Sequence, residues 1–135
     1  GDRLLNASAK NMGDGWEASN KNTAAAVDAI PKDIIICDWH YSEQPAYPSI
    51  DLFLEKGFRV WPASWKNKQA GLAMVSRARN DQTSRVLGYL GTSWVVHPGH
   101  FAQALLGEGD TELLKDRAIP AAATLKACME ALREP

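Results

Sequence analysis

The 135-residue chain has few cysteines, little net charge and no long apolar run. A net charge of −1 argues against a nucleic-acid partner, because such binders normally show a basic face. No stretch is apolar and long enough to span a membrane, and no signal peptide is recognisable, so we expect no membrane partner. No glycine-rich loop follows a predicted strand, so nucleotide binding of the Rossmann or P-loop kind is not expected either.

The two cysteines, Cys37 and Cys128, lie in an apolar run and in a helical pattern. Both are predicted to be small buried residues, and the sequence does not decide whether a disulfide joins them. Their spacing is not that of a metal site, so the sequence predicts no cofactor. The chain begins at Gly1 without an initiating methionine, which suggests a piece of a longer protein. The location of that parent is left open, with secreted or periplasmic as options.

Strand-like and helix-like segments alternate along the chain. Strands are predicted at 33–38 and 58–63 and within 85–96, where apolar residues run continuously as in strands covered on both faces. Helices are predicted at 16–30, 49–57 and 67–80, in a short segment of 97–110, and at 111–132 with a bend at Pro120. This alternation predicts an α/β fold with a parallel sheet.

The predicted strands end in aromatic residues. The first ends in Asp38-Trp39-His40-Tyr41, the second reaches Trp65 through "WPASW", and the third reaches Trp94 through "GTSW". In parallel α/β folds the loops after the strands converge and form the ligand site. Packing of the tryptophans against the helices is the alternative, but three equivalent positions favour a pocket with aromatic walls, which suits the apolar faces of a pyranose ring.

The segments "IPKDIIICDWHYS", "YPSIDLFLEKGFRVWPASWKN" and "LGYLGTSWVV" resemble the C-terminal half of the catalytic barrel of family-20 glycoside hydrolases, the β-N-acetylhexosaminidases and their relatives. The resemblance covers 1–96, and 97–135 would supply C-terminal helices. It implies a single domain over 1–135, forming the last three to four units of a TIM-type (β/α) barrel. It also implies binding of an N-acetylhexosamine-containing glycan.

In that family the 2-acetamido group of the substrate attacks the anomeric carbon, and the acid of an Asp-Glu pair protonates the leaving oxygen. No Asp-Glu pair occurs in this chain, so the resemblance places the catalytic pair upstream of Gly1 and no catalytic residue within the chain. The resemblance makes Trp39 and Trp94 stacking walls. Where the family usually offers a Tyr and an Asp, this chain has Ser64 or Trp65. The family's glutamate after the last Trp is also missing, and His97 or His100 is the polar candidate there.

The predicted substrate-binding residues are therefore Asp38, Trp39, His40, Tyr41, Trp65 and Trp94. One alternative is a non-catalytic carbohydrate-binding or pseudo-enzyme domain, and another is a scaffold with core tryptophans. A further alternative is a metal-dependent hydrolase using Asp38, His40, His97 and His100. Because three parallel strands leave two open sheet edges, we also expect a homo-oligomer that covers them.

Overall fold

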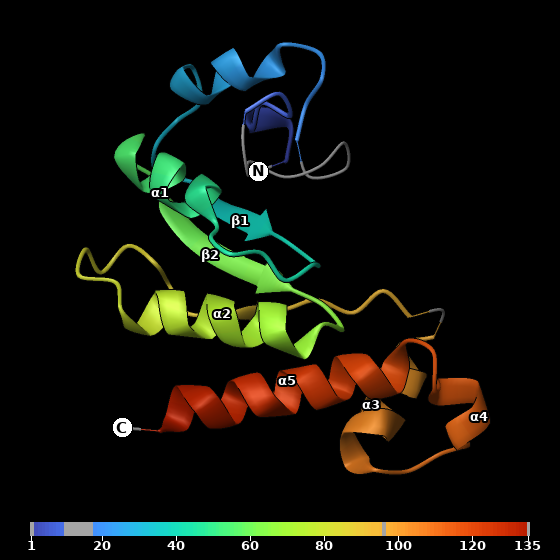
Figure 1. Cartoon of the computed structure of the whole chain (residues 1–135). Helices are drawn as coiled ribbons and strands as arrows, with labels where there is room; N and C mark the ends of the chain where they lie inside the picture. Colours follow the sequence, from blue (N-terminus) through green and yellow to red (C-terminus); the bar gives the residue numbers. More distant parts are fainter. Residues whose placement is uncertain (1, 10–17, 96, 135) are drawn as a thin grey trace.

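The computed structural model describes residues 2–9, 18–95 and 97–134 (Figure 1). Within these residues the chain forms an α/β fold around a small parallel sheet. The strands are β1 (Ile35–Trp39), β2 (Arg59–Ser64) and β3 (Leu90–Gly91), in the order β1-β2-β3. The helices are α1 (Pro48–Glu55), α2 (Lys68–Arg79), α3 (Pro98–Leu106), α4 (Thr111–Leu114) and α5 (Ala118–Arg133), with 3-10 helices η1 (Asp2–Leu4) and η2 (Thr23–Asp28).

All three strands run parallel, which confirms the predicted α/β fold with a parallel sheet. The register pairs Ile35 with Arg59 and Trp39 with Ala63, and continues by pairing Ala63 with Leu90. Since α1 connects β1 to β2 and α2 connects β2 to β3, each strand is followed by a helix before the next parallel strand begins. The carboxyl ends of the three strands therefore lie at one edge of the sheet, as the arrowheads of β1 and β2 show for these two strands (Figure 1).

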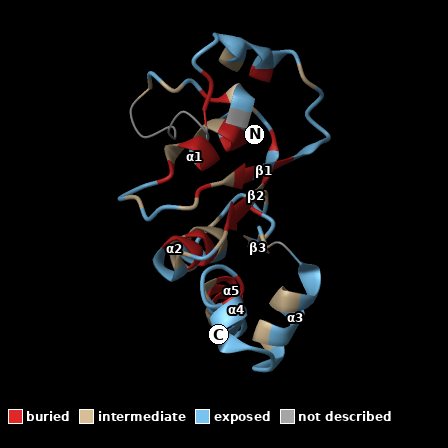
Figure 2. Ribbon diagram, turned by 90° about the vertical axis from the view of Figure 1, so that its right-hand side faces the viewer, coloured by how far each residue is buried: buried red, intermediate tan, exposed pale blue. Residues whose placement is uncertain are grey.

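Helices α1, α2 and α5 cover one face of this sheet. Successive strand residues point to opposite faces, and the set containing Ile36, Val60 and Pro62 is buried. On the same face, Gly91 of β3 meets Leu125 of α5. Buried residues follow β1, β2 and the inner sides of α1, α2 and α5 (Figure 2). The core therefore lies between the sheet and these helices, and it extends to Leu5, Ala18 and Val27 of the N-terminal segment.

The other sheet face is open, which corrects the prediction of strands covered on both faces. Ile35 is 38% exposed and Cys37 is also exposed, whereas Ile36 between them is only 4% exposed. The prediction of a buried Cys37 was therefore wrong, while Cys128 is buried as predicted. No disulfide joins Cys37 to Cys128.

Three predicted helices differ from the observed ones. Part of the predicted helix 16–30 lies outside the described residues. Within the described part, residues Thr23–Asp28 form the 3-10 helix η2. Ser49 does not cap α1 but lies inside it, fully buried. The predicted helix 111–132 is divided into α4 and α5, so Pro120 stands in the first turn of α5, where a missing N–H costs nothing, and causes no mid-helix bend. No described helix has the length and apolar character needed to cross a membrane.

Helices α2 and α5 pack closely together at Gly71. A Cβ at this position would lie 2.7 Å from Cys128 Sγ and 3.0 Å from Thr124 Cγ2. We expect Gly71→Ala to lower the free energy of unfolding by about 1 kcal/mol. Overpacking between the helices costs about 1–3 kcal/mol, and this cost exceeds the gain of about 1 kcal/mol from the higher helix propensity of alanine. Urea unfolding measures this difference.

Gly99→Ala is the matched control for this substitution. Gly99 lies in the first turn of α3, and apart from its chain neighbours and the backbone of its own helix, no described atom would lie within 4 Å of a Cβ there. Its stability should equal that of wild type or exceed it by up to about 1 kcal/mol, because no overpacking opposes the gain in helix propensity. A Gly71→Ala variant more stable than wild type would show that the two helices are not in tight contact at this glycine.

Candidate functional site

Aromatic side chains from the ends of β1 and β2 meet on the open side of the sheet. Tyr41, two residues after β1, lies between two tryptophans. Its ring centroid is 4.9 Å from that of Trp39 and 5.8 Å from that of Trp65, which stands edge-on. Residues that the sequence separates by a whole helix are thus neighbours at the strand ends.

The end of β3 completes this group. Trp94 Nε1 donates a hydrogen bond to the Tyr41 hydroxyl. The Thr92 hydroxyl donates to the Ser64 carbonyl at 2.9 Å and lies 3.3 Å from the same Tyr41 oxygen. Trp39, Tyr41, Trp65, Thr92 and Trp94 are called the tip cluster below. All three strand ends contribute to it, and Tyr41 is the residue that connects them.

The tip cluster borders a hollow of about 560 Å³ on the open sheet face. Four of its members line the hollow, and the floor is apolar: Cys37, Ala63 and Leu90. Trp94 is 60% exposed, so its ring is available to a ligand. The indole N–H of Trp65 is buried without a hydrogen-bond partner among the described residues. An apolar floor with aromatic walls and a few polar atoms is the usual make-up of a small-molecule site.

Asp38 and His40 lie on the opposite side of β1, because side chains alternate along a strand. They are 1% and 0% exposed, and both contact Ser49 of α1. The structure therefore brings together four of the six predicted site residues, namely Trp39, Tyr41, Trp65 and Trp94. It places the other two in the core beneath them.

Asp38, His40 and Ser49 form a buried hydrogen-bonded network. Ser49 Oγ donates to Asp38 Oδ2 at 2.7 Å, and His40 Nε2 lies 2.8 Å from Ser49 Oγ and 3.3 Å from the same carboxylate oxygen. The same ring nitrogen of His40 faces both the Ser49 hydroxyl and the Asp38 carboxylate, whereas in a catalytic triad the serine and the carboxylate bind different ring nitrogens. The network fixes the end of β1 to the start of α1.

A second buried contact supports the end of β2. The hydroxyls of Ser64 and Tyr89 are 2.9 Å apart, on the side of the sheet that faces Gly71 and Cys128. Burial raises the pKa of Tyr89 well above its usual value, and burial likewise raises the pKa of the Cys128 thiol. Both groups stay protonated near neutral pH. Ser64, considered from the sequence as a site residue, therefore packs towards the helices.

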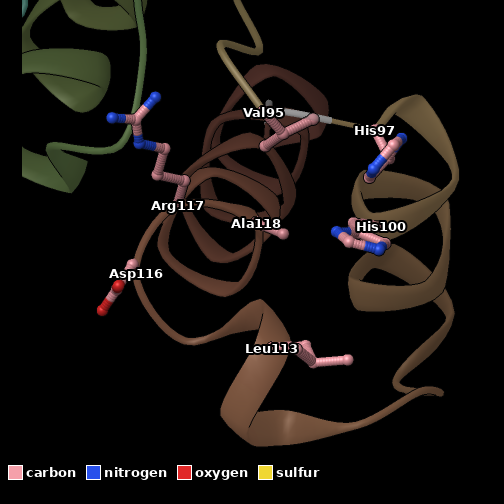
Figure 3. Close-up of a pocket in the computed structure, with 7 residues that line it drawn as sticks. All are labelled: Val95, His97, His100, Leu113, Asp116, Arg117 and Ala118. Atoms are coloured by element: carbon pink, nitrogen blue, oxygen red, sulfur yellow. The ribbon is translucent and has the colours of Figure 1, made fainter.

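His97 and His100 line a separate hollow of about 400 Å³ beside the start of α5 (Figure 3). Their ring centroids are 5.1 Å apart, and Val95, Leu113 and Ala118 form the apolar wall. Among the residues that the structure describes, no three His, Cys, Asp or Glu side chains are grouped as metal ligands would be. The four residues considered for a metal site are thus divided between this hollow and the buried network.

Thr92 and Arg117 are neighbours of the site that the sequence did not single out. Thr92 lies two residues before Trp94, and strand alternation could have placed both on one face. Arg117 comes from the start of α5 and contacts the Trp94 carbonyl at 3.5 Å, a tertiary contact without any signal in the sequence.

Comparison with models of known protein families and with curated proteins finds no match for this chain.

Proposed function

We propose that the tip cluster is a subsite for an N-acetylhexosamine-type sugar in a (β/α) barrel related to the family-20 glycoside hydrolases. The observation that carries this proposal is the convergence of Trp39, Tyr41, Thr92 and Trp94 onto one hollow, while Trp65 from the end of β2 packs edge-on against Tyr41. The three strands, each followed by helices on the same face, are compatible with part of such a barrel.

Each part of the cluster has a physical role in this proposal. Indole faces at Trp39 and Trp94 stack on the C–H face of a pyranose, while the Tyr41 and Thr92 hydroxyls bond its polar rim. Asp38 and His40 act indirectly, because their network holds the backbone from which Trp39 and Tyr41 project. Catalytic carboxylates would come from barrel strands outside this sequence, so the chain by itself should bind sugar without hydrolysing it.

Intrinsic tryptophan fluorescence tests the proposal directly. Titration with N-acetylglucosamine, and with a thiazoline analogue of the acetamido intermediate, should give a saturable change, because three of the five tryptophans lie in the cluster. Glucose, which lacks the acetamido group, is the control and should bind more weakly. A flat response to both acetamido ligands would contradict the proposal.

We further propose that the chain forms a homo-oligomer through its open sheet edges. β1 and β3 are the outer strands of the described sheet, and apolar residues beside them are exposed: Ile34 at 42%, Ile35 at 38% and Leu87 at 38%. Unpaired strand edges next to apolar surface favour association. Light scattering should give a molar mass of at least twice the 14.8 kDa of one chain. A single species of monomer mass at micromolar concentration would contradict this.

A further inference from the structure

Two cations from distant parts of the chain lie beside the Trp65 ring. Lys66 Nζ is 4.8 Å from the ring centroid, and the guanidinium carbon of Arg117 is 6.0 Å from it. Lys66 follows β2, whereas Arg117 immediately precedes α5. The same indole stands edge-on to Tyr41, so both cations lie at the rim of the tip cluster.

Neither cation is paired with a carboxylate among the described residues, in contrast to Lys56, Arg77 and Lys115. Lys66 Nζ donates to the Asp116 carbonyl at 3.4 Å, and Arg117 Nη1 donates to the Trp94 carbonyl at 3.5 Å. Both bonds are long. A guanidinium has five N–H donors and an ammonium three, so most of their donors have no protein acceptor there.

The neighbouring acid does not neutralise this pair. Asp116 and Arg117 both line the hollow of His97 and His100, but the Asp116 carboxylate points in a different direction from the Arg117 guanidinium, which lies on the far side from the two imidazoles (Figure 3). Two positive charges thus remain beside an aromatic wall. Planar guanidinium and mobile ammonium groups are the side chains that bind oxyanions, through charge-assisted hydrogen bonds.

We infer that the sugar bound at the tip cluster carries an anionic substituent, a sulfate ester or a carboxylate, which Lys66 and Arg117 bind. This inference rests on the proposed sugar subsite and specifies its substrate class. The ring would stack on the tip cluster while the oxyanion lies between the two cations beside Trp65. Neutral sugars would bind to the same aromatic walls without this contribution.

Isothermal titration of the whole chain with three sugars tests the inference: N-acetylglucosamine, its 6-sulfate and glucuronic acid. The 6-sulfate should bind about tenfold more tightly than the neutral sugar, because its sulfate accepts charge-assisted hydrogen bonds. The ratio of the two affinities should fall as the salt concentration is raised. In the Lys66→Gln and Arg117→Gln variants this affinity ratio should fall towards one. The Lys66→Arg variant, which keeps the positive charge, should have the wild-type ratio. Lys21→Gln, which changes an exposed lysine before η2, should leave the ratio at the wild-type value.

Each outcome has a separate meaning. Preference for glucuronic acid over the 6-sulfate would support the anionic class and assign the carboxylate, while tighter binding of the 6-sulfate than of N-acetylglucosamine would assign the sulfate ester. Equal affinity for the neutral and both anionic sugars would overturn the inference and leave the sugar subsite standing. Tight binding of the 6-sulfate that survives both glutamine variants would also overturn it. Failure of all three sugars to bind would overturn the subsite and the inference together.

Discussion

His40→Ala is expected to lower the free energy of unfolding by about 3 kcal/mol, the effect of removing a large buried side chain and one partner of a buried polar network. His40 is 0% exposed, and its ring centroid is 5.3 Å from that of Tyr47. Removing it creates a cavity and leaves the Asp38 carboxylate with a single side-chain donor, Ser49, of those described above. Urea or thermal unfolding measures the loss.

Two further variants separate the network from general effects. Ser49→Ala removes a smaller buried group and should cost about 1–2 kcal/mol. His97→Ala, the matched control, replaces an exposed histidine and should stay within about 0.5 kcal/mol of wild type. If His40→Ala were as stable as His97→Ala, the network would not fix the end of β1, and the supporting role assigned to Asp38 would be lost with it.

Trp94→Ala is expected to weaken binding of the acetamido sugar at least about 30-fold, the loss of roughly 2 kcal/mol typical of an aromatic residue that dominates a binding site. Trp94 is 60% exposed and its indole N–H bonds Tyr41, so truncation removes one wall and frees the residue that connects the cluster. Because so much of the ring is exposed, unfolding free energy should change by less than about 1 kcal/mol.

Conservative and distant controls make this result specific. Trp94→Phe keeps an aromatic face and should retain most of the affinity, although it loses the bond to Tyr41. Leu106→Ala truncates an apolar side chain that is 71% exposed on α3 and should leave sugar affinity unchanged. Equal affinity in Trp94→Ala and wild type would remove Trp94 from the subsite.

The order of the strands and helices could be predicted from the sequence, because apolar strand patterns alternate with helical patterns. Such an alternation is typical of a parallel sheet. The sequence could not show which sheet face is covered. Ile34, Ile35 and Ile36 are equally apolar, yet only Ile36 lies under the helices. Apolar residues on both faces of a strand carry no alternation from which burial can be predicted.

The same limit explains the division of the predicted site. Asp38, Trp39, His40 and Tyr41 are consecutive, and their shared position after a strand suggested one pocket. Alternation sends two of them to the open face and two to the core. The tryptophan positions predicted the tip cluster because parallel strands end at one edge, whereas Arg117 reaches it only through the packing of α5.

Indole N–H resonances in a two-dimensional proton–nitrogen spectrum measure sugar binding at the strand ends most directly, because each of the five tryptophans contributes one signal. On titration with N-acetylglucosamine, the signals of Trp39, Trp65 and Trp94, assigned by single Trp→Phe variants, should shift together with one dissociation constant. Shifts confined to other residues, or none at saturating sugar, would contradict a sugar subsite at the tip cluster.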